Sequence, residues 1–362
     1  MENTIPENLE ELCKANSNPN PVNIAGYGRE STHKGYLSWV FSTEHNKELA
    51  VNLIQALSNA FTQSNGLSDY THADCYFEQQ IGNRKVDLLV KLRSESSSKS
   101  QFLLPIELKT DSGPSGEKQF QDMSSQISAN PDYLGGLVFC LGSSCVQNYK
   151  WGKFQILGPD KILSYWKKFY DEGPDFLKDW LEMLAVEIGR KELAVEVYKL
   201  CKKDWGAFWG FGYRNYKHLM YYVYAKIRES LHSNNKSRTW EIYDGGYNAV
   251  MNLKSGSESW QDIPEINGLR WFFEFNDDRF CLKLEQNSDD LKVVSDWANK
   301  CVSTLKAYKS NQPIRTKNRR TWKKGWPLLG DWNVDFSDFA NLENQIDDII
   351  ESYGINGIMA DI

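Results

Sequence analysis

Alternating apolar and polar residues predict β-strands in the first half of the chain. Side chains along a strand point in turn to opposite faces. In the run 102–109 (FLLPIELK), Glu107 and Lys109 therefore share one face, while the apolar residues beside them turn toward a core. A second apolar run at 86–92 lies upstream, across a polar loop rich in serine and lysine. Two strands joined by an exposed loop predict a β-hairpin with antiparallel strands.

Further helical and strand-like runs surround this hairpin and predict the fold class. The run at 135–142 is apolar throughout, as in strands that are buried on both faces of a sheet. We expect helices at 31–41, 47–58, 117–128 and 159–170, and further strands at 76–82, 135–142 and 154–158. This order predicts an α/β fold in which helices flank a mixed sheet.

The pattern changes twice in the second half of the chain. It becomes helical after 173 and strand-like after 239. We expect helices at 175–187, 191–200, 217–231 and 288–308, and strands at 240–243, 249–253, 271–275 and 280–284. The chain is therefore expected to have three parts, namely an α/β core at 22–172, a helical segment at 173–235 and a C-terminal α+β domain at 236–362. Residues 1–22 show little periodicity, and we expect a loosely docked segment there.

Composition places the chain among ordinary globular proteins. Its 362 residues are enough for two cores, and 41% hydrophobic and 25% charged residues are typical values. No apolar run reaches the length of about 20 residues that a membrane helix needs, and the N-terminus lacks the features of a signal peptide. The seven cysteines contain no Cys-x-x-Cys pair, which favours reduced thiols over a zinc ribbon or a disulfide framework. We expect a cytoplasmic protein.

Charge is distributed unevenly along this acidic chain. The net charge of −6 does not by itself suggest nucleic acid, but residues 306–324 contain eight cations and no acid. Such a local patch attracts phosphates, with a solvated loop as the alternative. Trp322 and Trp326 lie within or beside it. The candidate nucleic-acid contacts are Arg315, Lys317, Arg319, Arg320, Lys323 and Lys324.

Two carboxylates of the hairpin form the candidate catalytic site. If the strands pair antiparallel, Asp87 and Glu107 converge, and converging carboxylates are ligands that Mg²⁺ takes together with water. Lys109 would then lie beside a metal-bound water. A metal ion lowers the pKa of that water, and the lysine orients it or stabilises the charged transition state. The set is suited to hydrolysis of a phosphodiester.

The order of these residues resembles the PD-(D/E)XK nuclease superfamily. The resemblance covers roughly residues 22–170, and one departure is that Val86 stands where many members have proline. It is similar to the branch that begins with a Glu-x-x-His helix, here Glu30 and His33. The residues that carry it, in chain order, are Glu30, Asp87, Glu107, Lys109 and Gln119.

The resemblance implies a restriction-endonuclease-like core and a metal-dependent endonuclease, with DNA as the expected substrate. It implies Mg²⁺ as the cofactor, with Mn²⁺ as a substitute, held by a metal set of Asp87, Glu107 and Leu108. Glu30 and Gln119 would be accessory catalytic residues, although Glu30 also fits a simple acid at a helix start and His33 fits a packing role. Restriction or antiviral defence is the implied setting.

Other interpretations remain open from the sequence. RNA could be the substrate, or the fold could serve a catalytically silent nucleic-acid-binding or regulatory protein. Residues 113–118 lack the spacing of a P-loop, so a motor would be a separate protein. Since one site per chain cuts one strand, cleavage of a duplex favours a homodimer.

Overall fold

The computed structural model describes residues 5–60, 70–94, 101–113, 117–201, 204–234, 238–253, 269–286, 290–316, 327–336 and 338–354. The chain forms two compact units. The first unit is Met1–Leu193 with Gly206–Arg214, and the second is Ala194–Trp205 with Asn215–Ile362. The helical segment expected at 173–235 is therefore divided between the two units.

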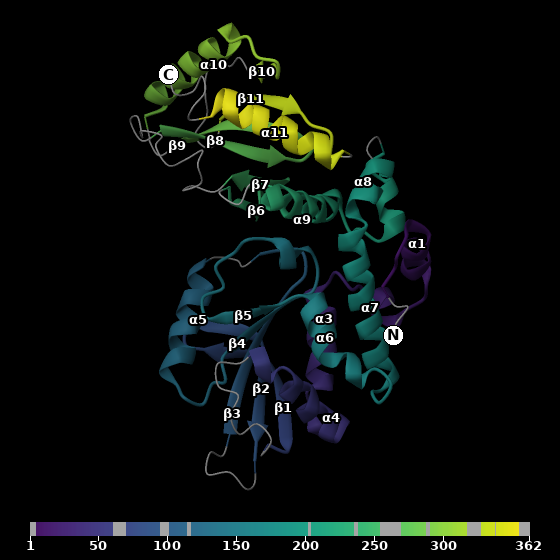
Figure 1. Ribbon diagram of the computed structural model, residues 1–362. Coiled ribbons are helices and arrows are strands. Elements are labelled where there is room, and N and C mark those ends of the chain that lie inside the picture. Colours follow the sequence, from purple (N-terminus) through teal and green to yellow (C-terminus); the bar gives the residue numbers. More distant parts are fainter. Residues whose placement is uncertain are drawn as a thin grey trace. The chain divides into compact units, whose positions relative to one another are not determined.

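A mixed five-stranded sheet forms the centre of the first unit (Figure 1). Its strands, in spatial as well as chain order, are β1 (His72–Ile81), β2 (Arg84–Arg93), β3 (Gln101–Lys109), β4 (Gly136–Cys140) and β5 (Phe154–Leu157). The first three strands are antiparallel, and β4 and β5 run parallel to β3. The expected α/β fold with a mixed sheet is confirmed, and so is the hairpin.

Helices cover both faces of this sheet. Figure 1 shows α5 on one side and α3, α4 and α6 on the other. The helices of the first unit after the N-terminal segment are α3 (Glu30–Val40), α4 (Thr43–Ala56), α5 (Glu117–Ala129), α6 (Pro159–Trp166) and α7 (Asp175–Glu192). Short 3₁₀ turns accompany them at Ser58–Ala60, Ser143–Val146, Lys167–Phe169 and Ala207–Phe211. The unit is a three-layer sandwich.

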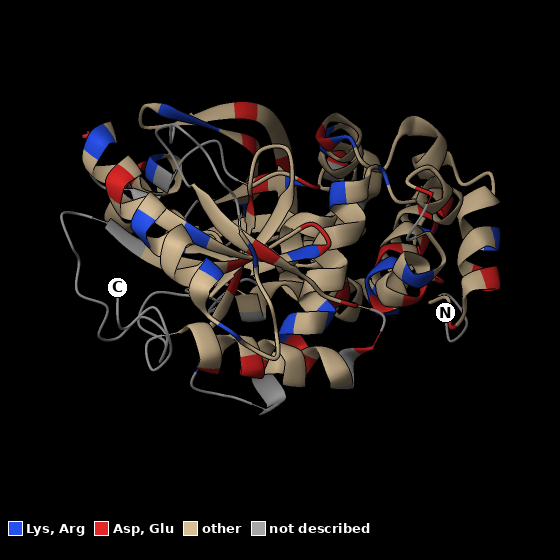
Figure 2. Cartoon of the chain, turned by 90° about the horizontal axis from the view of Figure 1, so that it is seen from above, with Lys and Arg blue, Asp and Glu red and all other residues tan. Residues whose placement is uncertain are grey.

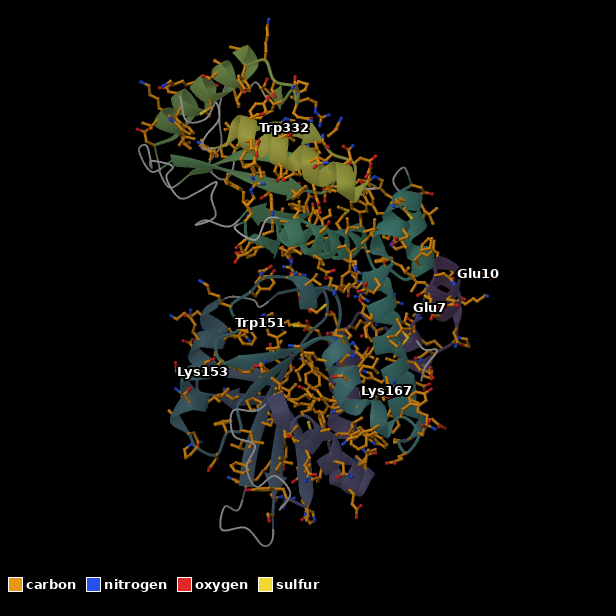
Figure 3. The ribbon with its side chains drawn as sticks, in the orientation of Figure 1. Glu7, Glu10, Trp151, Lys153, Lys167 and Trp332 are labelled. Atoms are coloured by element: carbon orange, nitrogen blue, oxygen red, sulfur yellow. The ribbon has the colours of Figure 1, made fainter. Side chains whose placement is uncertain are left out.

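The two faces of β3 show why the strand pattern predicts this layering. Ile106 and Leu108 of β3 are fully buried in the larger core. Trp166 of α6 and Trp180 of α7 belong to the same core. The opposite face of the sheet packs on α5 in a separate, smaller core, to which β1, β2, β4 and β5 contribute. There Phe120 meets Trp151, labelled in Figure 3, edge to face at 4.8 Å between ring centroids.

The N-terminal segment departs from expectation. Residues 9–25 form two short helices, α1 (Leu9–Ser17) and α2 (Pro21–Ala25), so the expected loosely docked segment is wrong there. Leu12 is fully buried and Val22 nearly so. The side chains of Asn8 and Asn20 cap the two helices. Each helix has too few apolar residues for a visible period, and the caps were the only sequence signal.

The second unit contains an antiparallel sheet of six strands in the order β10-β11-β9-β8-β7-β6. The antiparallel sheet is confirmed, whereas the sequence pattern missed β10, β11 and the last helix. The strands are β6 (Trp240–Asp244), β7 (Ala249–Leu253), β8 (Leu269–Asn276), β9 (Arg279–Gln286), β10 (Arg315–Thr316) and β11 (Leu328–Asn333). The helices are α8 (Ala194–Cys201), α9 (Tyr216–Asn234), α10 (Leu291–Ala307) and α11 (Phe339–Tyr353).

Aromatic side chains form much of the core of the second unit. Phe273 of β8 and Phe280 of β9 lie diagonally across the strand pair, and their rings stack with centroids 5.4 Å apart. Trp332 of β11, labelled in Figure 3, lies 5.9 Å from Phe280 and 5.0 Å from Tyr353 of α11. The high aromatic content of the chain is thus used here for packing. Within the described ranges, no helix combines the length and the apolarity needed to cross a membrane.

Candidate active site

Asp87 of β2 and Glu107 of β3 lie side by side, and the side chain of each is hydrogen-bonded to the backbone of the other strand. The register pairs Leu88 with Ile106, which places the two acids next to each other at the end of the ladder. The backbone N–H of Asp87 donates to Glu107 Oε2 at 3.3 Å, and the N–H of Leu108 donates to Asp87 Oδ2 at 2.8 Å. The hairpin therefore fixes both carboxylates through backbone amides, and the two acids converge as expected for an antiparallel pair.

The other predicted catalytic residues lie around this pair. Lys109 Nζ donates to Glu107 Oε1 at 2.9 Å and lies 3.9 Å from Glu30 Oε2, at the first turn of α3. Gln119 Nε2, in the first turn of α5, reaches the same Glu107 oxygen at 3.4 Å. Helices from both faces of the sheet thus contribute to one strand end. All five candidate catalytic residues come together.

Two charged residues of the site were missed by the sequence reasoning. Lys34 Nζ lies 2.6 Å from Asp87 Oδ1 and 3.7 Å from Glu78 Oε1. Lys34 is one helical turn after Glu30, so the two residues face the same way, and that spacing was the available signal. The position of Glu78 on β1 by itself predicts an exposed strand glutamate. It is more than half exposed, but it belongs to this cluster.

Burial and like charge act on the acids of the site. Burial raises the pKa of Glu107, and the neighbouring carboxylate of Asp87 adds to the rise, which Lys109 only partly offsets. Burial also raises the pKa of Glu30, against the charge of Lys109. The protein therefore destabilises the ionised form of both carboxylates.

The two lysines remain charged. Burial lowers the pKa of Lys109, but the charges of Glu107 and Glu30 outweigh it and the net pKa is raised. For Lys34, burial likewise lowers the pKa, and the hydrogen bond and charge of Asp87 more than offset that effect. Both side chains are ammonium ions at neutral pH. They act as donors and positive charges, not as bases.

A buried ion network fixes the turn that follows β3. Arg214 Nε donates to Asp111 Oδ2 at 2.5 Å, and its Nη2 donates to Asp111 Oδ1 at 2.8 Å and to Glu187 Oε1 of α7 at 3.0 Å. A Cβ on Gly142 would lie 2.6 Å from that guanidinium, so only glycine leaves room for it. Since Asp111 is two residues beyond Lys109, the network holds this end of β3 in place.

His33 has a structural role. Its ring is fully buried, accepts a hydrogen bond from Trp180 Nε1 at Nδ1 (3.1 Å) and donates from Nε2 to the Tyr27 carbonyl (2.5 Å). Burial lowers the pKa of His33 to about 4, so the ring is neutral. Of the two interpretations of His33, the structure supports packing.

The donor set at this strand end fits Mg²⁺. No group of three or more His, Cys, Asp or Glu side chains suited to a metal ion occurs within the described ranges. Asp87 and Glu107 form a pair of hard oxygen ligands, and Mg²⁺ characteristically takes one or two carboxylates and keeps several waters. Leu108 could add only its main-chain carbonyl oxygen. Its N–H already orients Asp87.

The candidate nucleic-acid contacts lie mostly outside the described residues. That applies to Lys317, Arg319, Arg320, Lys323 and Lys324. Arg315 is described, and its half-exposed guanidinium forms an ion pair with the buried carboxylate of Asp331. Acidic and basic residues are interspersed along the helices and strands that are drawn (Figure 2).

Comparisons with protein-family models, with curated proteins and with solved structures give no match to this chain. The functional argument therefore depends on the geometry of the site.

Proposed function

We propose that this protein is a Mg²⁺-dependent nuclease with a PD-(D/E)XK core that hydrolyses phosphodiester bonds in DNA. One observation carries the proposal. Asp87, Glu107 and Lys109 meet at a strand end, where backbone amides fix the two acids and the lysine lies 2.9 Å from Glu107. Two like charges are held together there although burial disfavours them, which is typical of sites arranged for chemistry.

In this proposal Asp87 and Glu107 hold the ion, with the Leu108 carbonyl as a further oxygen. Bound Mg²⁺ supplies an activated water and neutralises charge that develops on the phosphate. Lys109 is an ammonium ion and donates to that water or to a phosphate oxygen. Restriction or phage defence is the setting that the resemblance suggests.

Glu30 and Gln119 have accessory roles. Glu30 lies near the Lys109 ammonium and its raised pKa suits a group that accepts a proton from water. The Gln119 amide holds Glu107 Oε1 from the other face of the sheet. In this proposal neither Glu30 nor Gln119 takes over the role of Asp87 and Glu107 as ligands of the metal ion.

Cleavage assays test the proposal. Supercoiled plasmid, linear duplex DNA and single-stranded RNA are incubated with Mg²⁺, with Mn²⁺ or with chelator. We expect metal-dependent cleavage of DNA, reduced by about 10²-fold or more in Glu107→Ala and in Lys109→Ala. Lys91→Ala, on the same strand as Asp87 but without a role in the site, is the matched control and should cut normally.

One observation favours a second candidate. Each carboxylate already has a lysine within 2.9 Å, so the site is charge-balanced without an ion. A catalytically silent protein that binds nucleic acid would fit this balance. Binding of DNA with no cleavage under any metal condition would favour it, whereas cleavage of RNA alone would change the substrate and leave the chemistry intact.

A further inference from the structure

The Lys34 ammonium occupies the side of Asp87 that faces α3. Asp87 Oδ2 accepts the Leu108 amide, and Oδ1 accepts Lys34 at 2.6 Å. Both oxygens of this proposed metal ligand are thus engaged, one of them by a full positive charge. A second cation that approaches Asp87 meets that charge at close range in a site where Asp87 is only 13% exposed.

Glu78 provides a second partner for the same ammonium. Its Oε1 lies 3.7 Å from Lys34 Nζ, while its side chain is 58% exposed. Because the ion pair with Asp87 is shorter and more buried, Lys34 pairs mainly with Asp87 when no metal ion is bound. Glu78 already forms a long ion pair with Lys34 through Oε1 and another with Lys85 through Oε2, each at 3.7 Å. A small rotation of the Lys34 side chain therefore transfers its ammonium from Asp87 to Glu78.

The backbone at Glu78 supports a functional role. The β1–β2 ladder pairs Phe77 with Leu88 and Gln79 with Val86, which leaves Glu78 opposite Asp87 where the ladder is interrupted. Glu78 has φ 47°, a left-handed conformation that is uncommon for a residue other than glycine. Such strain is typical of positions where function requires a particular side-chain direction.

We propose that Lys34 is a built-in counter-ion that competes with the metal ion for Asp87, and that Glu78 receives the lysine when Asp87 is released. This inference rests on the proposed metal-dependent function and adds a control of its metal requirement. Without metal, the positive charge of Lys34 offsets the negative charge of Asp87 and so reduces its repulsion with Glu107. With metal, the ammonium stays paired because it moves to Glu78.

The two partners of Lys34 should have opposite effects on metal affinity. Lys34→Met removes the competitor, so Asp87 should bind metal about tenfold more tightly. Glu78→Gln removes the second partner and leaves Lys34 on Asp87, so binding should weaken by about threefold. In the double variant the Glu78 change should have no further effect, because the lysine through which it acts is absent.

Mn²⁺ binding to the full chain without nucleic acid measures this directly. Free Mn²⁺ is followed by electron paramagnetic resonance, and the Glu107→Gln variant defines binding outside the site. Lys91→Met removes the same charge from the strand that carries Asp87. It is the control for net charge and should bind Mn²⁺ like the wild type. A lysine needed only for structure would give weaker binding when removed, so the sign of the change discriminates.

The outcomes separate this inference from the proposed function. Tighter binding in Lys34→Met, weaker binding in Glu78→Gln and a double variant that matches Lys34→Met support the inference. Wild-type binding with unchanged or weaker binding in Lys34→Met overturns it and leaves the metal site standing, and so does a Glu78→Gln effect that persists in the double variant. No Mn²⁺ site in either the wild type or Lys34→Met overturns both proposals.

Discussion

The two sheets both bury charged side chains, but they arrange them differently. In the first unit, Asp87 and Glu107 lie side by side on adjacent strands, and each carboxylate accepts a backbone N–H of the other strand. In the second unit, Glu274 of β8 and Asp331 of β11 are separated by β9. Burial therefore does not by itself bring like charges together. Among the described residues, the first sheet brings Asp87 and Glu107 together where β2 and β3 meet.

Each of these four acids has a cation beside it, so the presence of a cation does not distinguish the sheets. Glu274 is paired with Lys283 and Asp331 with Arg315, as Asp87 is with Lys34 and Glu107 with Lys109. In the first sheet, burial and the charge of Asp87 keep the pKa of Glu107 raised even though Lys109 lies close. The arrangement in the second sheet serves folding, whereas the one in the first sheet costs stability, as expected if the proposed chemistry retains it.

The largest expected effect concerns the ion pairs of Arg214, which match two acids of the first unit with a cation. Arg214→Met should destabilise the protein by about 3–5 kcal/mol, because it removes the guanidinium that Asp111 shares with the fully buried Glu187 and leaves Arg190 as the neighbouring cation of Glu187. Urea denaturation followed by tryptophan fluorescence measures the loss. Arg84→Met removes an ion pair with Asp122 that is more than a third exposed, and should cost less than about 1 kcal/mol. Equal costs for the two changes would contradict the assignment of Arg214.

The next effect concerns the paired acid of the second sheet. Glu274→Gln should destabilise the protein by about 2 kcal/mol, because Lys283 loses its opposite charge in a position that is only 15% exposed. Asn276 also loses a charged acceptor at 2.8 Å. The same denaturation experiment applies. A variant as stable as the wild type would show that this pair is not structural and would remove the contrast between the sheets.

The same substitution in the first sheet should have the opposite sign. Glu107→Gln, unfolded in the presence of chelator at pH 8, should be about 1 kcal/mol more stable than the wild type, and in the separate Mg²⁺ assay it should lose cleavage. The folded-state pKa of Glu107 is raised, so the wild type is penalised for its charge above that pKa. The gain should shrink as the pH falls and vanish once the carboxyl is protonated in both folded and unfolded states. Destabilisation at pH 8 would mean that the pair with Lys109 outweighs the repulsion.

The smallest effect concerns neighbouring acids at the turn between β8 and β9. Burial, with the charge of Asp278, raises the pKa of Asp277 to about 6. Asp277→Asn should therefore stabilise the protein at pH 8 by about 0.5–1 kcal/mol, discounted for the partial exposure of this turn. Asparagine also tolerates the positive φ of 52°. Thermal unfolding across pH should show the gain rise between about pH 4 and 6 and stay constant above; a gain that is independent of pH would exclude this cause.

Local patterns predicted the site more completely than its surroundings. Period-two alternation placed Glu107 and Lys109 on one face, and the loop between the two apolar runs predicted the antiparallel pairing that brings Asp87 to Glu107. Both features depend on neighbouring residues and on strand geometry. The short helices α1 and α2 gave no such pattern, and neither did the two-residue strand β10.

The sequence by itself determined the α/β class of the first unit and the strand end at which its candidate chemistry lies. Only the tertiary structure decided which cations pair with the acids at and beside that strand end. Lys34 reaches Asp87 because α3 packs across the sheet, and Arg214 reaches Asp111 from a segment distant in sequence. Backbone geometry fixes the direction of a side chain within its own element, whereas a contact between elements depends on how their buried faces pack.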